Sequence, residues 1–379
     1  MASPNGWGPI DSADVTLPGG SARKKLEELA LVGPDVWARR VPPVGPPPPF
    51  DPEVAAALAA LPNKSPTEVI AAALARHGPL PESLPALVEA FRDSPGATEP
   101  TDDDLSHGGE YAVTRMSVPR SDGTGLIELV VCRPAADAAM PRPLLYTIHG
   151  GGMISGTSRT GLQEQLELAR PVGAVIVSVE YRLAPEHPSP APAEDCYDGL
   201  LGFLREAERF DVDPHGVVVV GSSAGGCFAA AVCLMARDLG GPEIAGQLLM
   251  TPMLDARNST RSSYQLSGVD TWDRDCNDLG WMSLLGPGRD PADASAYESP
   301  SLADNLSSLP PAFLDVGSAE TFRDEVVAYA GGIWAAGGSA ELHVWPGGFH
   351  GYEVVAPQSR IAQRTWDARS KWLQQLLQL

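Results

Sequence analysis

The sequence predicts an α/β protein in which a largely parallel sheet is covered by helices on both faces. From residue 111 onward, short apolar runs rich in β-branched residues recur, and helical patterns separate most of the later ones. Strands that alternate with helices imply a parallel sheet. One run, GVVVVG at 216–221, is apolar throughout, which is typical of a central strand buried on both faces.

The expected elements follow in order along the chain. Strands are expected at residues 111–118, 126–133, 143–149, 173–181, 216–221, 244–251, 311–317 and 340–346. Helices are expected at residues 191–209, 224–239, 321–336 and 357–377. From the fourth strand on, the helices fall between most of the strands, as covering both faces of a parallel sheet requires.

Two segments stand outside this alternation. Residues 1–105 are expected to form a helical region without a sheet of its own, interrupted by the proline-rich segment 42–49. Its helical patterns lie at 21–31, 51–61, 65–77 and 84–93. Residues 257–298 carry tryptophan and tyrosine anchors but no strand pattern. An insertion of this length between two strands is expected to form a lid or cap.

Composition and charge exclude several classes of protein. The 27 Lys and Arg against 48 Asp and Glu give a net charge of −21, so a nucleic-acid partner is not expected. The longest apolar run, 224–236, is shorter than the roughly 18 residues of a membrane span. The first fifteen residues lack a basic segment and an apolar core, so we expect no signal peptide. The 5 cysteines, without a C-x-x-C pair, are interpreted as free thiols. We therefore expect a cytoplasmic protein without a metal.

The first chemical motif is Gly-Ser-Ser-Ala-Gly at 221–225, which matches G-x-S-x-G. By chance alone, a chain of this composition holds about 0.3 such matches. The context makes the motif informative, because it directly follows the buried strand at 216–221 and opens an apolar helix. A strand–turn–helix of this kind presents a serine oxygen above the sheet, so Ser223 is the candidate nucleophile. The alternative is a glycine-rich turn with an incidental serine.

The second motif is His149-Gly150-Gly151-Gly152, directly after the expected strand 143–149. Consecutive glycines leave backbone N–H groups uncovered and able to point into a cleft. A tetrahedral oxyanion needs such donors, and the loss of one costs about 3 kcal/mol of transition-state stabilisation. The alternative, a flexible loop, rarely follows a histidine at the end of a strand.

A serine nucleophile needs a base and an acid that orients the base. His350 follows the last expected strand, at the sheet edge where Ser223 also emerges. For the acid, Glu320 lies just beyond the strand at 311–317, whereas Asp315 is inside that strand and Asp324 falls a turn later on a helix. Position therefore favours Glu320.

These motifs together resemble a known family. HGGG, the elbow at 221–226, YRLAPEHPSPAPAEDC at 181–196 and the closing FHG at 349–351 resemble the bacterial hormone-sensitive-lipase-like (family IV) carboxylesterases of the α/β-hydrolase fold. The resemblance covers roughly residues 110–379. It implies an eight-stranded, mostly parallel sheet with a catalytic domain made of residues 106–256 and 299–379. It also implies a cap built from residues 1–105 and 257–298.

The resemblance also implies roles for individual residues. Ser223 is the nucleophile, His350 the base and Glu320 the acid, at a position where the family generally carries Asp. The amides of Gly151, Gly152 and Ala224 form the oxyanion hole. Ser222 stands where the family mostly has Asp, and Met153 follows HGGG where an aromatic residue is common.

The expected activity is hydrolysis of short- to medium-chain carboxylic esters through an acyl-enzyme, with a small-molecule ester as substrate and no cofactor. Two alternatives stay open. One is a catalytically silent ligand receptor of the same fold, against which the complete set of Ser223, Glu320 and His350 argues. The other is a lactonase, amidase or acyltransferase that uses the same triad. The family also includes homodimers formed through the last strand, so a homodimer is compatible with the resemblance.

Overall fold

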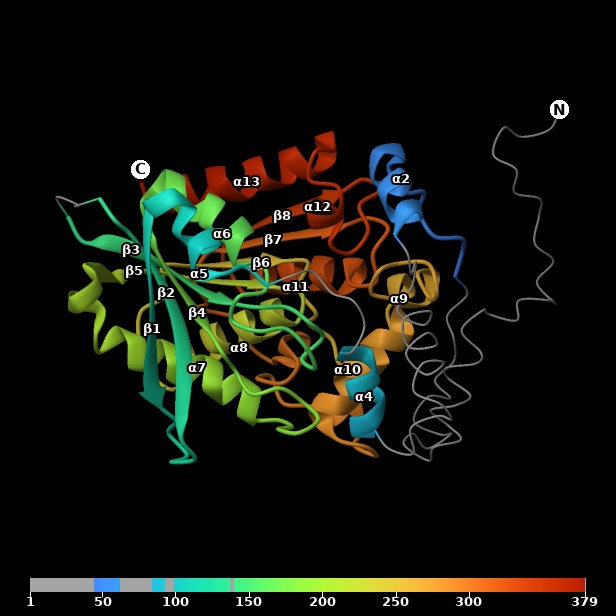
Figure 1. The fold of residues 1–379 in the computed structure, drawn as a ribbon. Helices are drawn as coiled ribbons and strands as arrows, with labels where there is room; N and C mark the ends of the chain where they lie inside the picture. The colour runs from blue at the N-terminus through green and yellow to red at the C-terminus, as the bar shows by residue number, and fades with distance from the viewer. Residues whose placement is uncertain (1–43, 62–83, 93–98, 137–139, 379) are drawn as a thin grey trace.

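The sheet is present as expected in the computed structural model, which describes residues 44–61, 84–92, 99–136 and 140–378. In this part of the chain, eight strands form one sheet (Figure 1). The strands are β1 (Tyr111–Pro119), β2 (Leu126–Pro134), β3 (Arg142–Ile148), β4 (Val175–Val179), β5 (Val212–Ser222), β6 (Gly246–Met250), β7 (Ala312–Gly317) and β8 (Ala340–Trp345). Each expected strand is confirmed, and β5 begins before its apolar run.

The order of the strands in the sheet is β1-β2-β4-β3-β5-β6-β7-β8. β1 pairs antiparallel with β2, and β2 antiparallel with β4. From β4 to β8 every neighbouring pair is parallel. The sheet is thus mostly parallel, with an antiparallel hairpin at one edge, and the carboxyl ends of β3, β5, β6, β7 and β8 lie along one edge.

Helices connect the strands from β3 onward and pack against both faces of the sheet. In the described residues they are α2 (Pro52–Ala60), α4 (Leu84–Arg92), α5 (Asp102–Ser106), α6 (Leu162–Ala169), α7 (Ala191–Leu204), α8 (Ala224–Asp238), α9 (Arg261–Gln265), α10 (Arg274–Leu285), α11 (Arg323–Ala335), α12 (Tyr352–Val355) and α13 (Arg360–Leu376). The expected helices at 21–31 and 65–77 lie outside the described residues. α6, between β3 and β4, was not predicted from the sequence.

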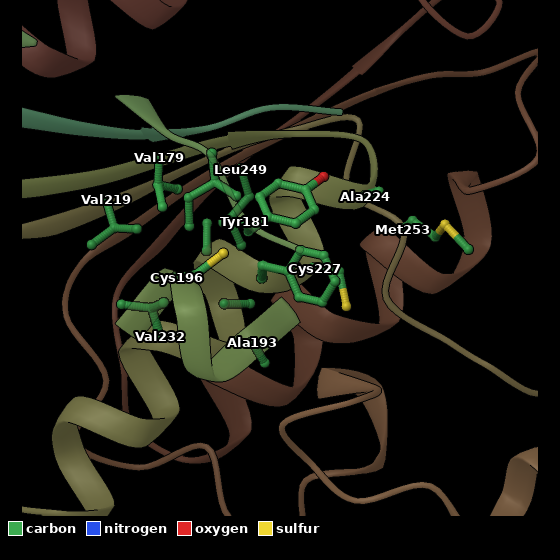
Figure 2. Packing of buried hydrophobic residues seen from close by; sticks show 14 of the residues in the cluster. Val179, Tyr181, Ala193, Cys196, Val219, Ala224, Cys227, Val232, Leu249 and Met253 are labelled. Atoms are coloured by element: carbon green, nitrogen blue, oxygen red, sulfur yellow. The ribbon is translucent and has the colours of Figure 1, made fainter. Parts of the chain in front are cut away.

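Two apolar layers sandwich the sheet. Val217 and Val219 of β5 belong to a cluster with α7, α8 and α11, while Val218 and Val220 belong to a second cluster with α6 and α13. Alternate residues of a strand point to opposite faces, so this division confirms that the VVVV run is buried on both sides. Figure 2 shows the first layer, where Cys196 of α7 and side chains of α8 pack beneath the strands.

The N-terminal helices contact different parts of the molecule. Phe91 of α4 packs edge-on against Trp272 at 6.1 Å between ring centroids, and α4 lies beside α10 in Figure 1. α2 instead joins a cluster that includes Phe349 and Tyr352, next to α12 and α13. The insertion 257–298 contains α9 and α10 and no strand in its described residues, as expected.

All five cysteines are buried free thiols, as predicted. Within the described ranges, none of the helices combines the length and the apolar character needed to cross a membrane.

Candidate active site

Ser223 occupies a sharp turn between β5 and α8. Its φ of 56° and ψ of −121° lie in a region that a residue with a side chain rarely adopts. The turn is fixed from both sides, because the Ser223 N–H donates to Met250 O at 2.9 Å and its carbonyl accepts from Met253 N at 3.0 Å. The side chain is buried but not sealed, with 7% of Ser223 exposed. This strained strand–turn–helix is the elbow that the motif predicts.

The elbow glycines are required by close backbone contacts. A Cβ on Gly221 would lie 2.1 Å from the carbonyl oxygen of Gly225, and one on Gly225 would lie 2.0 Å from that of Ile148. Neither distance is compatible with a side chain, so the elbow packs directly against the carboxyl end of β3. That contact brings Ser223 beside the glycine loop that follows β3.

The glycine loop lies against the serine. A Cβ on Gly150 would lie 3.3 Å from the Cβ of Ser223. The loop is held by hydrogen bonds from Ile154 N and Ser155 N to the carbonyl oxygen of Gly151, at 3.1 and 2.9 Å.

The three predicted oxyanion amides remain available in this arrangement. No described residue accepts a hydrogen bond from the N–H groups of Gly151, Gly152 or Ala224. Gly151 and Gly152 have φ values of 116° and 62°, which favour glycine. Donors of this kind can bind a developing negative charge without first breaking other hydrogen bonds.

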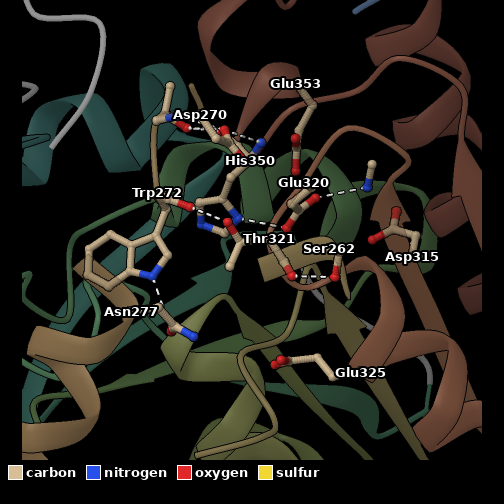
Figure 3. A network of polar contacts seen from close by, with 12 residues as sticks. Ser262, Asp270, Trp272, Asn277, Asp315, Glu320, Thr321, Glu325, His350 and Glu353 are labelled. Atoms are coloured by element: carbon tan, nitrogen blue, oxygen red, sulfur yellow. Dashed lines mark hydrogen bonds and ion pairs between the residues drawn. The ribbon is translucent and has the colours of Figure 1, made fainter. Parts of the chain in front are cut away.

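His350 and Glu320 form a hydrogen-bonded pair at the same edge of the sheet (Figure 3). His350 Nδ1 lies 2.8 Å from Glu320 Oε1, and the Gly317 N–H donates to Glu320 Oε2 at 2.8 Å. Glu320 is fully buried, and Phe322 packs edge-on against the imidazole at 5.2 Å. Because the carboxylate binds Nδ1, it leaves Nε2 as the nitrogen that can take a proton from a nucleophile.

The surroundings tune both members of the pair. Burial alone would lower the pKa of His350, but the hydrogen bond and charge of Glu320, with the charges of Asp270 and Glu353, raise it above the ordinary value. Burial raises the pKa of Glu320, against the opposing effect of its hydrogen bond to His350. The imidazole is therefore a stronger base than a free histidine.

The two rejected carboxylates have other partners. Asp315 is fully buried and pairs with Arg369 of α13 through contacts of 2.8 and 3.0 Å. Asp324 accepts a hydrogen bond from Ser262 N at 2.9 Å and pairs with its neighbour Arg323. Of these candidates the structure brings Glu320 to His350, as its position in the sequence predicts.

His149 has a structural environment unlike that of His350. Its ring stacks on Tyr181 at 4.2 Å between centroids, and its carbonyl oxygen accepts the Tyr181 hydroxyl at 2.9 Å. Burial lowers the pKa of His149 to about 4. The ring is therefore neutral at physiological pH and orders the glycine loop by stacking.

A polar contact that was not predicted from the sequence joins the insertion to the His350 loop. His350 N donates to Asp270 Oδ1 at 3.0 Å, and the Thr271 hydroxyl donates to the carbonyl oxygen of His350. The carbonyl of Trp272 accepts from Thr321 Oγ1 at 2.8 Å, and its indole rests on Gly152, where a Cβ would lie 2.0 Å from the ring. The Trp272 anchor is the one local signal for this contact. No sequence motif marks Asp270 or Thr271.

A metal site was not predicted. In the part of the chain that the structure describes, no group of three or more His, Cys, Asp or Glu side chains is arranged to hold a metal ion.

Comparison with known proteins identifies the family. A family model described as the alpha/beta hydrolase fold matches residues 145–354, more than half of the chain. The chain belongs to this α/β-hydrolase family. The matched stretch contains the glycine loop, Ser223, Glu320 and His350.

Related proteins refine this assignment. Carboxylesterase NlhH of Mycobacterium tuberculosis (strain ATCC 25618 / H37Rv) is 38% identical over 215 residues, which cover 55% of this chain and 66% of NlhH, just under two thirds of its length. Esterase LipI of the same strain is 33% identical over 244 residues, covering 63% of this chain and 74% of LipI. The structure of a bacterial heroin esterase aligns with a TM-score of 0.73 and 34% identity, covering 86% of this chain and 98% of that one. The resemblance to hormone-sensitive-lipase-like carboxylesterases is confirmed.

Proposed function

We propose that this hydrolase is a serine carboxylesterase that cleaves small-molecule esters through an acyl-enzyme. The observation that carries the proposal is the 2.8 Å hydrogen bond between His350 Nδ1 and Glu320 Oε1. It lies at the sheet edge where a strained turn presents Ser223. A nucleophile, a base and an acid that orients the base are the groups that acyl transfer from an ester requires.

In the first step, His350 takes the hydroxyl proton of Ser223 through Nε2 as the serine oxygen attacks the ester carbonyl. Glu320 keeps the proton of His350 on Nδ1 and stabilises the imidazolium that forms. The imidazolium then gives its proton to the departing alcohol, and the acyl-enzyme remains. In the second step, water loses a proton to His350 and attacks the acyl carbon, which releases the acid and restores the serine.

The tetrahedral intermediates of both steps carry a negative oxygen. The N–H groups of Gly151, Gly152 and Ala224 are the donors we assign to it. Two observations support this assignment. No described residue accepts a hydrogen bond from these N–H groups, and the glycine loop lies against Ser223. Each donor of this kind contributes about 3 kcal/mol of transition-state stabilisation.

We further propose that α4 and the insertion form a cap that favours short- to medium-chain acyl groups. The Trp272 indole rests on Gly152, and Phe91 supports it from α4. Gly280 of α10 also packs on the glycine loop, where an added Cβ would lie 2.7 Å from the carbonyl oxygen of Gly152. With aromatic and helical walls this close to the proposed oxyanion donors, a long acyl chain has little room on that side.

The test is hydrolysis of p-nitrophenyl acetate, butyrate, octanoate and palmitate by the wild type and by Ser223→Ala. We expect the wild type to prefer the shorter esters and Ser223→Ala to lose activity while keeping its circular dichroism spectrum. A fluorophosphonate probe should label the wild type and not the variant. If the folded wild type neither hydrolyses an ester nor reacts with the probe, the esterase proposal fails and a ligand receptor takes its place.

A further inference from the structure

Asp270 is a buried residue of the insertion, and one oxygen of its carboxylate accepts a hydrogen bond from the His350 loop. The residue is fully buried. Its Oδ1 accepts from His350 N at 3.0 Å and from Thr271 N at 2.6 Å (Figure 3). No described residue donates to Oδ2, which is also buried. Burying a carboxylate oxygen that accepts no hydrogen bond lowers the stability of the folded protein, and a functional role for Asp270 in the active site would explain why it is buried there.

The neighbours of Asp270 bind the loops of both the proposed base and the proposed acid. The Thr271 hydroxyl donates to the carbonyl oxygen of His350. The carbonyl of Trp272 accepts a hydrogen bond from Thr321 Oγ1 at 2.8 Å, and Thr321 directly follows Glu320 in the chain. Three consecutive residues of the insertion therefore bind the main chain of His350 on one side of the Glu320–His350 hydrogen bond and the side chain of Thr321 on the other.

The charge of Asp270 acts on the imidazole as well. Burial raises the pKa of Asp270 to about 7, while the positive charge of His350 lowers it and the negative charge of Glu320 raises it. In return, Asp270 raises the pKa of His350, together with Glu320 and Glu353. Glu353 is itself paired with Arg369 at 2.9 Å. Ionised Asp270 consequently favours the imidazolium, the form that appears as the serine is deprotonated.

We propose that Asp270 is a positioning residue for His350, which fixes the histidine main chain and supplies a second negative charge that stabilises the imidazolium. The inference rests on the proposed function, because it concerns the base of that reaction. It assigns the insertion a part in catalysis beyond enclosing the substrate.

Asp270→Asn separates charge from position, because its amide oxygen can still accept from His350 N. We expect kcat for p-nitrophenyl butyrate to fall about tenfold with little change in KM. The acid limb of the pH profile of kcat/KM should move to lower pH by up to about one unit, the order by which a neighbouring negative charge shifts the pKa of a histidine. The shift stays below that full value because Asp270, with a pKa of about 7, is only partly ionised over the limb. An acid limb identical to that of the wild type would overturn the proposal.

Thr271→Val separates position from charge and remains informative if Asp270→Asn does not fold. It removes the hydroxyl bond to the His350 carbonyl and the longer, 3.2 Å contact of the same hydroxyl with Asp270 Oδ1, and it keeps the carboxylate and its hydrogen bonds from the main-chain N–H groups of His350 and Thr271. We expect kcat to fall several-fold with the acid limb unmoved, and a wild-type kcat would contradict the positioning role. Melting temperatures from circular dichroism identify variants that are folded.

The matched control is Asp293→Asn, which removes an exposed charge from the same insertion. It should leave both kcat and the acid limb unchanged, and an equal shift in this variant would assign the effect to net charge and overturn the proposal.

Labelling of the wild type by a fluorophosphonate distinguishes failure of the role proposed for Asp270 from failure of the esterase proposal. If the wild type is labelled and active but the Asp270→Asn profile does not move, the role of Asp270 fails and the esterase proposal stands.

Discussion

At the scale of single residues, the two oxygens of the Glu320 carboxylate have different partners. The carboxylate accepts from Nδ1 of His350 at 2.8 Å, and it is held in place by the Gly317 N–H. An aspartate at this position would be shorter by one methylene, so the Glu320 side chain reaches the imidazole from slightly further back.

Glu320→Gln tests the charge of this acid. We expect kcat to fall about a thousandfold or more, because an amide can favour the wrong tautomer of the imidazole and does not stabilise the imidazolium. Glu320→Asp should retain more activity than Glu320→Gln. The control is Glu341→Gln, which alters an exposed Glu–His pair with His343 on β8 and should leave kcat unchanged. Undiminished turnover in Glu320→Gln would mean that another group orients His350.

The pH dependence follows from His350. As the proposed base, His350 must be neutral to accept the serine proton, so we expect kcat/KM to fall as pH drops through its pKa. Since Glu320, Asp270 and Glu353 raise that pKa above the ordinary 6.5, we expect the acid limb above pH 6.5. Rates for p-nitrophenyl butyrate measured between pH 5 and 9 locate it. A midpoint clearly below 6.5 would contradict the electrostatic environment described for the imidazole.

At the scale of elements, a buried ion pair joins the sheet to the last long helix. Arg369 of α13 contacts Asp315 of β7 and Glu353 of α12, and all three residues are buried. β7 ends just before Glu320 and α12 begins just after His350. The ion pair therefore fixes the elements that carry the proposed acid and base.

Asp315→Ala should affect stability far more than chemistry. It leaves Arg369 with one fewer buried partner, and breaking such a pair costs about 3–5 kcal/mol. We expect a lower midpoint of urea unfolding and, at a temperature where the variant is folded, a kcat close to that of the wild type. A variant with wild-type stability and no activity would instead assign Asp315 to the reaction.

The elements show where prediction from sequence succeeds. Strands such as β5 are recognised because their apolar β-branched runs are local, yet β5 begins at Val212 because main-chain pairing with Arg142 extends it through polar residues. Strand order depends on contacts between distant segments, so the antiparallel pairing of β2 with β4 left no local pattern. Ser223, in contrast, was predicted from the sequence because its motif directly follows its strand in the chain. Asp270 was not, because its contact with His350 joins two segments far apart in the chain.

At the scale of the whole molecule, the proposed catalytic edge and the insertion form one packed unit. α10 rests on the glycine loop through Gly280, and the segment before it binds the His350 loop. Phe91 of α4 extends this contact to the N-terminal region. A change in the insertion should therefore alter both which ester is accepted and how the base is held.

Trp272→Ala tests how the insertion limits the substrate. It removes the indole from above Gly152 while leaving the main-chain carbonyl that accepts from Thr321. We expect the ratio of kcat/KM for p-nitrophenyl octanoate to that for acetate to rise about tenfold, because a vacated apolar wall gives a longer acyl chain a surface to bury. Trp334→Ala, at a half-exposed position of α11, is the control and should leave the ratio unchanged. If Trp272→Ala lowers both rates equally, the indole orders the glycine loop but does not set the chain length, and the limit on acyl length must come from another wall of the site.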